Sequence, residues 1–273
     1  MIAHGSAFPV AKLALNNSVP PILMASLRMF LVFIILIPFW RFRIPSKKFF
    51  KPLLIFSLTM GVLVYVFMNL SLYHSSIISP IILGSQLAIP FGVLASAFIL
   101  KENISKNKWL LILASFLGIL IIFFDPKLNE NYLGLFFASL MALFFGLAQV
   151  YSRQLKELPT SMINASTGVF GFSLLLILSI IFEGNIYQNI EQININSWIL
   201  ISYQAVIVSL CAHLLMFYLY KFYTVGQIFP FYSLFPIFGI ILSYITFGEV
   251  PTLMFILGGI IVISSVFLLH KIK

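Results

Sequence analysis

The stretch PIFGIILSYITFGE, residues 236–249, is a long apolar run that begins at a proline and ends at a glutamate. A second stretch, PFGVLASAFILKE at residues 90–102, also begins at a proline and ends at a glutamate, with GVLAS in the place of GIILS. The final residues of the two stretches, Glu102 and Glu249, lie 147 positions apart. Such an internal match predicts two related halves, which we place at residues 1–125 and 126–273.

Shorter matches in the same order support the duplication. Residues 5–7 (GSA) correspond to residues 146–148 (GLA), Lys12 to Arg153, and residues 25–30 to residues 165–170. On this alignment the first half starts about nine residues later than the second. We therefore expect a first helix that is short at its start, either because the natural start lies upstream or because this copy is truncated.

The composition indicates a protein that lies in lipid. Hydrophobic residues make up 61% of the chain and charged residues 8%, whereas a soluble domain carries about 25% charged residues. The net charge of +9 is concentrated in short segments between apolar runs, which argues against a nucleic-acid-binding surface. Cys211 is the only cysteine, so neither an internal disulfide nor a cysteine metal site is expected.

Ten apolar runs are candidates for membrane helices, since a span needs about 20 mostly apolar residues. The runs are continuous rather than alternating, which predicts helices and not strands. The predicted fold class is an all-α integral membrane protein with ten transmembrane helices. We place them at residues 1–15, 22–40, 52–73, 80–100, 108–124, 132–150, 161–182, 197–220, 226–247 and 252–270.

The positive charges predict the orientation. Loops after the even-numbered spans contain Lys and Arg, as in residues 41–51 and 101–108, whereas Lys127 is the one basic residue in the odd-numbered loops. Short basic loops remain in the cytoplasm, so we expect both termini there and the protein in the cell (inner or plasma) membrane. Five spans per half is an odd number, so the halves must be inverted, an architecture typical of alternating access.

The opening GSAFPVAK, residues 5–12, resembles the Trp-Gly-x-x-x-Pro-x-x-Lys start of EamA-type members of the drug/metabolite transporter superfamily, with His4 in the place of the Trp. Arg28 lies where these proteins have an Arg in the second span. The two stretches that end in glutamate match the Leu-Gly-Glu-like ends of the fourth and ninth spans, with Lys101 in the place of the first Gly. The resemblance implies ten spans in two inverted halves and the export or exchange of small metabolites such as amino acids.

Ionisable side chains inside a bilayer are costly and usually serve a function. Lys12 and Arg28 are the cations predicted within spans, and no Asp or Glu is predicted at mid-span. Arg28 is the candidate for binding a substrate carboxylate; the alternatives are contacts with backbone carbonyls or extension to the outer surface. The lack of a mid-span carboxylate favours facilitated diffusion or exchange, with proton coupling through His213 as the alternative.

Polar residues of the third span share one helix face. Tyr65, Asn69 and Tyr73 are spaced at i, i+4 and i+8. In lipid such a face turns towards a cavity or another helix, so we predict substrate binding, with interhelical hydrogen bonds as the alternative. Single polar residues of the fourth, eighth and ninth spans are further candidates for substrate binding: Gln86, Gln204, His213 and Tyr232.

The repeat also relates charges near the span ends. Glu102 and Arg153 lie at cytoplasmic ends, and their repeat partners Glu249 and Lys12 lie at outer ends. We predict two alternating gates, with Glu102 paired to Arg153 inside and Glu249 paired to Lys12 outside. The alternative is that both glutamates stabilise helix N-termini. Kinks that permit movement are expected at four prolines of the fourth and ninth spans: Pro80, Pro90, Pro230 and Pro236.

No enzyme is predicted, since H-E-x-x-H, G-x-S-x-G and paired intramembrane carboxylates are absent from the sequence. Neither a cofactor nor a metal site is expected. The predicted function is transport of small metabolites, most simply the export or exchange of amino acids or related metabolites. The alternatives are a flippase for a lipid-linked metabolite and a truncated, non-transporting paralogue. The expected partners are a small-molecule substrate and membrane lipids, not nucleic acid, and a homodimer stays open.

Overall fold

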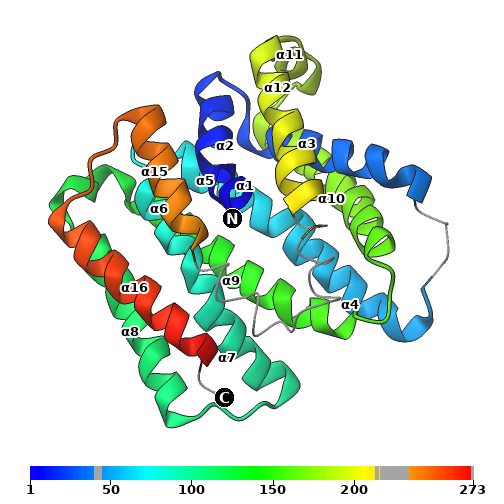
Figure 1. The fold of residues 1–273 in the computed structure, drawn as a ribbon. Coiled ribbons are helices and arrows are strands. Elements are labelled where there is room, and N and C mark those ends of the chain that lie inside the picture. Colours follow the sequence, from blue (N-terminus) through cyan, green and yellow to red (C-terminus); the bar gives the residue numbers. More distant parts are fainter. Residues whose placement is uncertain (40–44, 213–214, 216–233, 272–273) are drawn as a thin grey trace.

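The computed structural model describes residues 1–39, 45–212, 215 and 234–271, and every regular element of this part is helical (Figure 1). In chain order the elements are α1 (Ile2–Gly5), α2 (Ala7–Asn16), α3 (Pro21–Leu36), η1 (Ile37–Phe39), α4 (Lys47–Leu58), η2 (Thr59–Leu63), α5 (Val64–Tyr73), α6 (Ser79–Gly84), η3 (Ser85–Leu87), α7 (Ala88–Leu100), α8 (Lys106–Phe123), η4 (Pro126–Asn131), α9 (Tyr132–Gln154), α10 (Thr160–Glu183), α11 (Ile186–Glu191), α12 (Ile195–Tyr203), η5 (Gln204–Ala212), α15 (Phe235–Phe247) and α16 (Leu253–Lys271).

Six helical segments of the described residues are long and apolar enough to cross a membrane: Lys47–Tyr73, Ser79–Leu100, Lys106–Phe123, Tyr132–Gln154, Thr160–Glu183 and Ile195–Ala212. Three shorter apolar helices, Pro21–Leu36, Phe235–Phe247 and Leu253–Leu269, coincide with further predicted spans. The predicted first span corresponds to the short helices α1 and α2. The end of the eighth predicted span and the start of the ninth lie outside the described residues.

Several predicted spans are interrupted rather than continuous. The first breaks at Ser6, between α1 and α2, and the fourth contains the 3-10 turn η3. The third and eighth contain the π-helical segments η2 and η5, at corresponding places in the two halves. π-helical turns are rare and frequently lie at functional sites.

The prolines of the fourth and ninth spans were predicted to kink their helices, and two of them do not. Pro80 and Pro236 lie in the first turns of α6 and α15, where the missing N–H would have had no helical partner. The predicted mid-helix kink is therefore wrong at these two positions. Pro90 is the third residue of α7, directly after η3, and Pro230 lies outside the described residues.

The helix contacts follow one pattern in both halves. α9 runs through the middle of the molecule and packs against α4 and α7 (Figure 1). In the corresponding places, α2 packs against α12 and α1 against α15. Two further contacts join corresponding helices directly, α3 with α10 and α8 with α16. The contacts therefore keep their pattern when the two halves are exchanged.

Two of these contacts are backbone approaches at glycines. A methyl carbon added to Gly146 would lie 2.6 Å from the Gly92 nitrogen, and one added to Gly5 would lie 2.8 Å from the Gly239 nitrogen. These four glycines are repeat partners, and their crossings join α9 to α7 and α1 to α15. No other residue type allows helices to come this close.

We expect Gly146→Ala to lower the stability of the protein by about 1–3 kcal/mol, because the methyl group overlaps the α7 backbone. Thermal unfolding of the purified protein in detergent measures this. Gly84→Ala is the matched control, since its added carbon would meet the Ala138 Cβ at an ordinary 3.4 Å. Equal stability of the Gly146 variant and the control would contradict a tight crossing.

The two stretches that end in glutamate share one helix ending. Gly248 ends α15 in the left-handed conformation, with φ 68° and ψ 22°. Lys101 ends α7 in the same conformation, with φ 55° and ψ 34°. Glycine adopts this conformation at no steric cost, whereas a lysine is strained there. The departure of Lys101 from the repeat pattern therefore carries a penalty in backbone energy.

Lys101→Gly should raise the stability by about 0.5–1 kcal/mol, since it removes that strain at a position that already has the glycine conformation. The opposite change in the other half, Gly248→Ala, should lower the stability. Both are read from thermal unfolding. A Lys101→Gly protein less stable than the parent would show that the lysine side chain contributes more than the strain costs.

Candidate functional site

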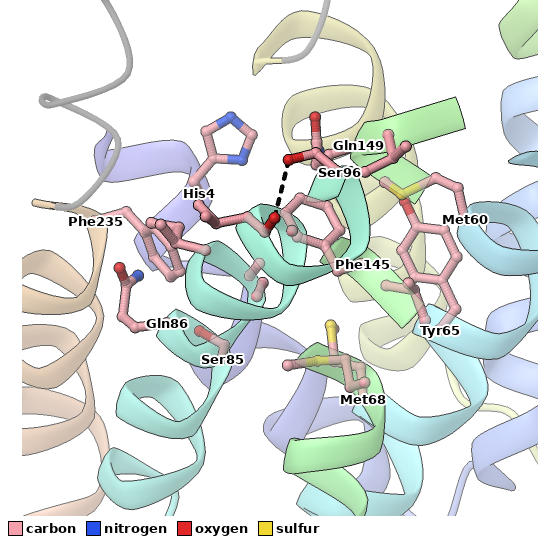
Figure 2. Close-up of a pocket in the computed structure, with 18 of the residues that line it drawn as sticks. His4, Met60, Tyr65, Met68, Ser85, Gln86, Ser96, Phe145, Gln149 and Phe235 are labelled. Carbon is pink, nitrogen blue, oxygen red and sulfur yellow. Dashed lines mark hydrogen bonds between the residues drawn. The ribbon is translucent and has the colours of Figure 1, made fainter. Parts of the chain in front are cut away.

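A cavity of about 330 Å³ lies among helices of both halves. Its walls come from α1, α2, α3, η2, α5, η3, α7, α8, α9, η5, α15 and α16. Figure 2 shows many of the side chains that line it. The volume is typical of sites for small molecules, which span about 300–1,000 Å³. Much of the wall consists of aromatic and methionine side chains: Phe8, Met60, Met68, Met141, Phe145 and Phe235.

Arg28 is the buried charge of this cavity. It extends from α3 and is only 3% exposed. Its Nε donates to the Ser209 hydroxyl at 2.9 Å and its Nη1 to the Gln204 Oε1 at 2.8 Å. Its guanidinium carbon lies 4.3 Å from the centre of the Tyr65 ring. Among the described residues no carboxylate lies within ion-pair distance of Arg28, so its positive charge is held by neutral groups alone.

Two more predicted residues line the cavity. Tyr65 lies under the Arg28 guanidinium. Gln86 is 1% exposed on η3, and its Oε1 has no hydrogen-bond partner among the described residues. An unpaired buried acceptor is costly in a folded protein. The 3-10 turn η3 therefore presents an amide oxygen that a donor on a ligand can satisfy.

The other predicted binding residues lie elsewhere. Asn69 shares the helix face of Tyr65, but its Nδ2 donates to the Pro21 carbonyl at 2.8 Å and so ties α5 to the start of α3. Tyr73, at the end of α5, is 56% exposed and packs edge-on against His74. His213 and Tyr232 lie outside the described residues. Only the first residue of the predicted face therefore borders the cavity.

The charges predicted to form gates have unequal surroundings. Arg153 lies 3.3 Å from Glu102, and these side chains are 61% and 50% exposed. Both line one end of the cavity. The outer pair does not form in this structure, because the Lys12 Nζ donates to the Leu72 and Ser75 carbonyls at 2.8 and 2.6 Å. Carbonyls at the end of a helix attract a cation, and α5 ends at Tyr73.

Glu249 stabilises a helix N-terminus instead of pairing with Lys12. Its Oε1 accepts from the Ile78 N–H at 2.7 Å, and its Oε2 accepts from the Ser79 N–H at 2.9 Å and from the Ser79 hydroxyl. The carboxylate at the end of α15 therefore holds the start of α6. Unpaired N–H groups and the helix dipole favour an anion at this place.

Two residues that hold α3 and its Arg28 in place were not predicted from the sequence. Glu183, interpreted only as part of an outer loop, caps α3 by accepting from the Ile22 and Leu23 N–H groups at 2.6 and 2.8 Å. Ser209 binds Arg28 from η5. A glutamate at the end of one span is a weak signal for such a cap, whereas the partner of Arg28 leaves no pattern in the sequence.

The comparison with known families shows the family of this chain. The model of the EamA-like transporter family matches residues 1–124 and again residues 132–270. The chain belongs to the EamA-like transporter family. This family is part of the drug/metabolite transporter superfamily, so the protein is a multi-pass membrane protein of the transporter type, and its relatives are transporters rather than enzymes.

A solved structure shares this EamA fold. Its title is "Crystal structure of protein", and it aligns with a TM-score of 0.61 at 17% identity over 97% of this chain and 93% of its own. At this identity the likeness concerns the fold alone. The search of curated proteins returned no match.

Glu249→Gln should destabilise this EamA protein by about 1–3 kcal/mol, because the amide cannot replace a carboxylate that accepts from several N–H and O–H groups. Glu102→Gln, at the repeat-equivalent position, should change stability by less than about 1 kcal/mol, as expected for an exposed ion pair. Thermal unfolding of the two variants gives the comparison. Equal effects would mean that the contacts with α6 contribute little.

Proposed function

We propose that this protein exports or exchanges amino acids or related metabolites and that Arg28 binds their carboxylate. The observation that carries the proposal is the burial of Arg28 beside the cavity with neutral partners only. A buried cation without an anion is unfavourable in a medium of low dielectric constant. A substrate carboxylate would supply the missing charge.

The guanidinium is arranged for this task. A guanidinium has five N–H donors, and a carboxylate binds best to two of them in parallel. Ser209 takes the Nε donor of Arg28 and Gln204 takes one donor of Nη1. Nη2 has no protein partner among the described residues, which leaves Nη2 and the second N–H of Nη1 to donate to a carboxylate. The Tyr65 ring supports the plane of the group from below.

The remaining wall suits an amino acid with a large apolar side chain. Aromatic rings and the thioethers of Met60 and Met68 supply a polarisable surface. The free Oε1 of Gln86 is an acceptor for the ammonium group. Glu102, half exposed at one end, is the acidic residue among the described residues of the wall. This favours exchange or facilitated diffusion over proton coupling by a buried carboxylate.

We propose that the transport mechanism is alternating access by ten spans in two inverted halves, 1–125 and 126–273, with both termini in the cytoplasm and the protein in the inner or plasma membrane. The exchangeable contact pattern and the paired glycine crossings support this symmetry. Two contacts are expected to open in turn. One is the ion pair between Arg153 and Glu102, and the other is the contact between the Glu249 carboxylate and the start of α6.

The test is exchange in proteoliposomes preloaded with unlabelled L-phenylalanine, with uptake of labelled L-phenylalanine as the readout. Arg28→Ala should raise KM at least about tenfold, since a charged hydrogen-bonded pair contributes about 1.5–3 kcal/mol. Arg28→Lys should be intermediate, because lysine keeps the charge and loses the paired donors. Lys127→Ala, an exposed cation outside the cavity, is the matched control, and L-phenylalaninamide should not exchange.

Each contrary result has a definite meaning. An unchanged KM in Arg28→Ala would remove Arg28 from the binding site. No exchange of labelled phenylalanine, leucine or methionine by folded protein would overturn the amino-acid proposal. Uptake of a lipid-linked metabolite in the same vesicles would then favour a flippase.

A further inference from the structure

The amide of Gln204 joins three membrane segments. Gln204 is the first residue of η5 and is fully buried. Its Oε1 accepts from the Arg28 Nη1 at 2.8 Å, and its Nε2 donates to the Ala7 carbonyl at 2.5 Å. One side chain therefore connects α3, where Arg28 lies, with the first residue of α2.

The orientation of this amide is determined by its two neighbours. A guanidinium offers only donors, and a backbone carbonyl only accepts. Only one orientation of the amide satisfies both, with Oε1 towards Arg28 and Nε2 towards Ala7. If the Ala7 carbonyl moved away, the amide could rotate and present its own donors to the cation. The hydrogen bond to Ala7 therefore maintains the acceptor that holds Arg28.

We propose that Gln204 is the positioning residue of the carboxylate site and that it orients Arg28 only while α2 contacts η5. The inference rests on the proposed function of Arg28. Gln204, which the sequence predicted to bind substrate, is not among the residues that line the cavity. In this proposal it acts on the substrate only through Arg28, by holding Nη1 and so limiting the rotation of the guanidinium. The residue next to Gln204 strengthens the same contact, since the Tyr203 hydroxyl lies 2.8 Å from the Ser6 hydroxyl.

This arrangement links binding to conformation. Ser6 and Ala7 lie at the break between α1 and α2, and α1 packs on α15 through Gly5 and Gly239. Movement of the first helix relative to η5 separates Ala7 from Gln204 and so releases the constraint on Arg28. Affinity for a carboxylate therefore falls in any state that breaks this contact. Such a change in affinity between states is what a carrier needs to release its substrate.

Two substitutions at Gln204 test the role by KM and kcat for exchange of labelled L-phenylalanine. Gln204→Met keeps the length of the side chain but replaces the amide by a thioether, which cannot donate and accepts only weakly. It should raise KM about tenfold or more, the loss expected for one hydrogen bond to a charged group. Gln204→Glu places a carboxylate beside Arg28 that competes with the substrate for its charge, and should raise KM further. Asn131→Leu is the control. It removes another buried amide, whose Oδ1 accepts from the Ser76 N–H at 2.7 Å and which does not line the cavity, and it should leave KM unchanged.

A second measurement needs no substrate. In a double-mutant cycle with Arg28→Met, followed by thermal unfolding, the proposal expects non-additive effects: Gln204→Met should cost less stability once Arg28 is gone. Additive effects, or an unchanged KM in both Gln204 variants, would overturn the positioning role. If Arg28→Ala itself leaves KM unchanged, it is the proposed function that fails, whereas a raised KM in Arg28→Ala with normal Gln204 variants refutes only this inference.

Discussion

Close backbone contact at helix crossings is the constraint on which this arrangement depends. Lipid is as apolar as the helices, so helices associate in it through packing and hydrogen bonds rather than through the hydrophobic effect. Gly5 on Gly239 and Gly146 on Gly92 provide that packing at repeat-related positions. A side chain at Gly5 or Gly146 would overlap the backbone of the partner helix and so separate helices that form the walls of the cavity. The cavity therefore owes its shape to the absence of side chains at the crossings.

Irregular helix geometry supplies the polar groups of the site. The cavity lies beside the break at Ser6 and beside η2, η3 and η5. Non-regular backbone is tolerated at membrane depth where protein or a cavity surrounds it. At these places the carbonyl of Ala7 and the amides of Gln86 and Gln204 become available. The halves thus use their interruptions to build a polar centre inside an apolar bundle.

The sequence alone indicated the membrane class, the apolar helices that the structure describes and, in agreement with the double family match, the duplication. These properties depend on local hydrophobicity and on residue order, which need no knowledge of the fold. Arg28 was found for the same reason, because a charge inside an apolar run is conspicuous wherever the helix packs. The EamA resemblance of the opening residues agreed with the family match.

Tertiary structure alone decided the partners. Tyr65, Asn69 and Tyr73 share a face by spacing, but only Tyr65 borders the cavity, because α3 covers Asn69 and Tyr73 lies at the exposed helix end. Lys12 and Glu249 have complementary charges, yet helix ends are nearer to each of them and offer several backbone groups at once. The dependence of Arg28 on Gln204 joins positions 176 residues apart. A pattern in sequence reports which groups need partners, and only the fold brings particular partners within hydrogen-bond distance.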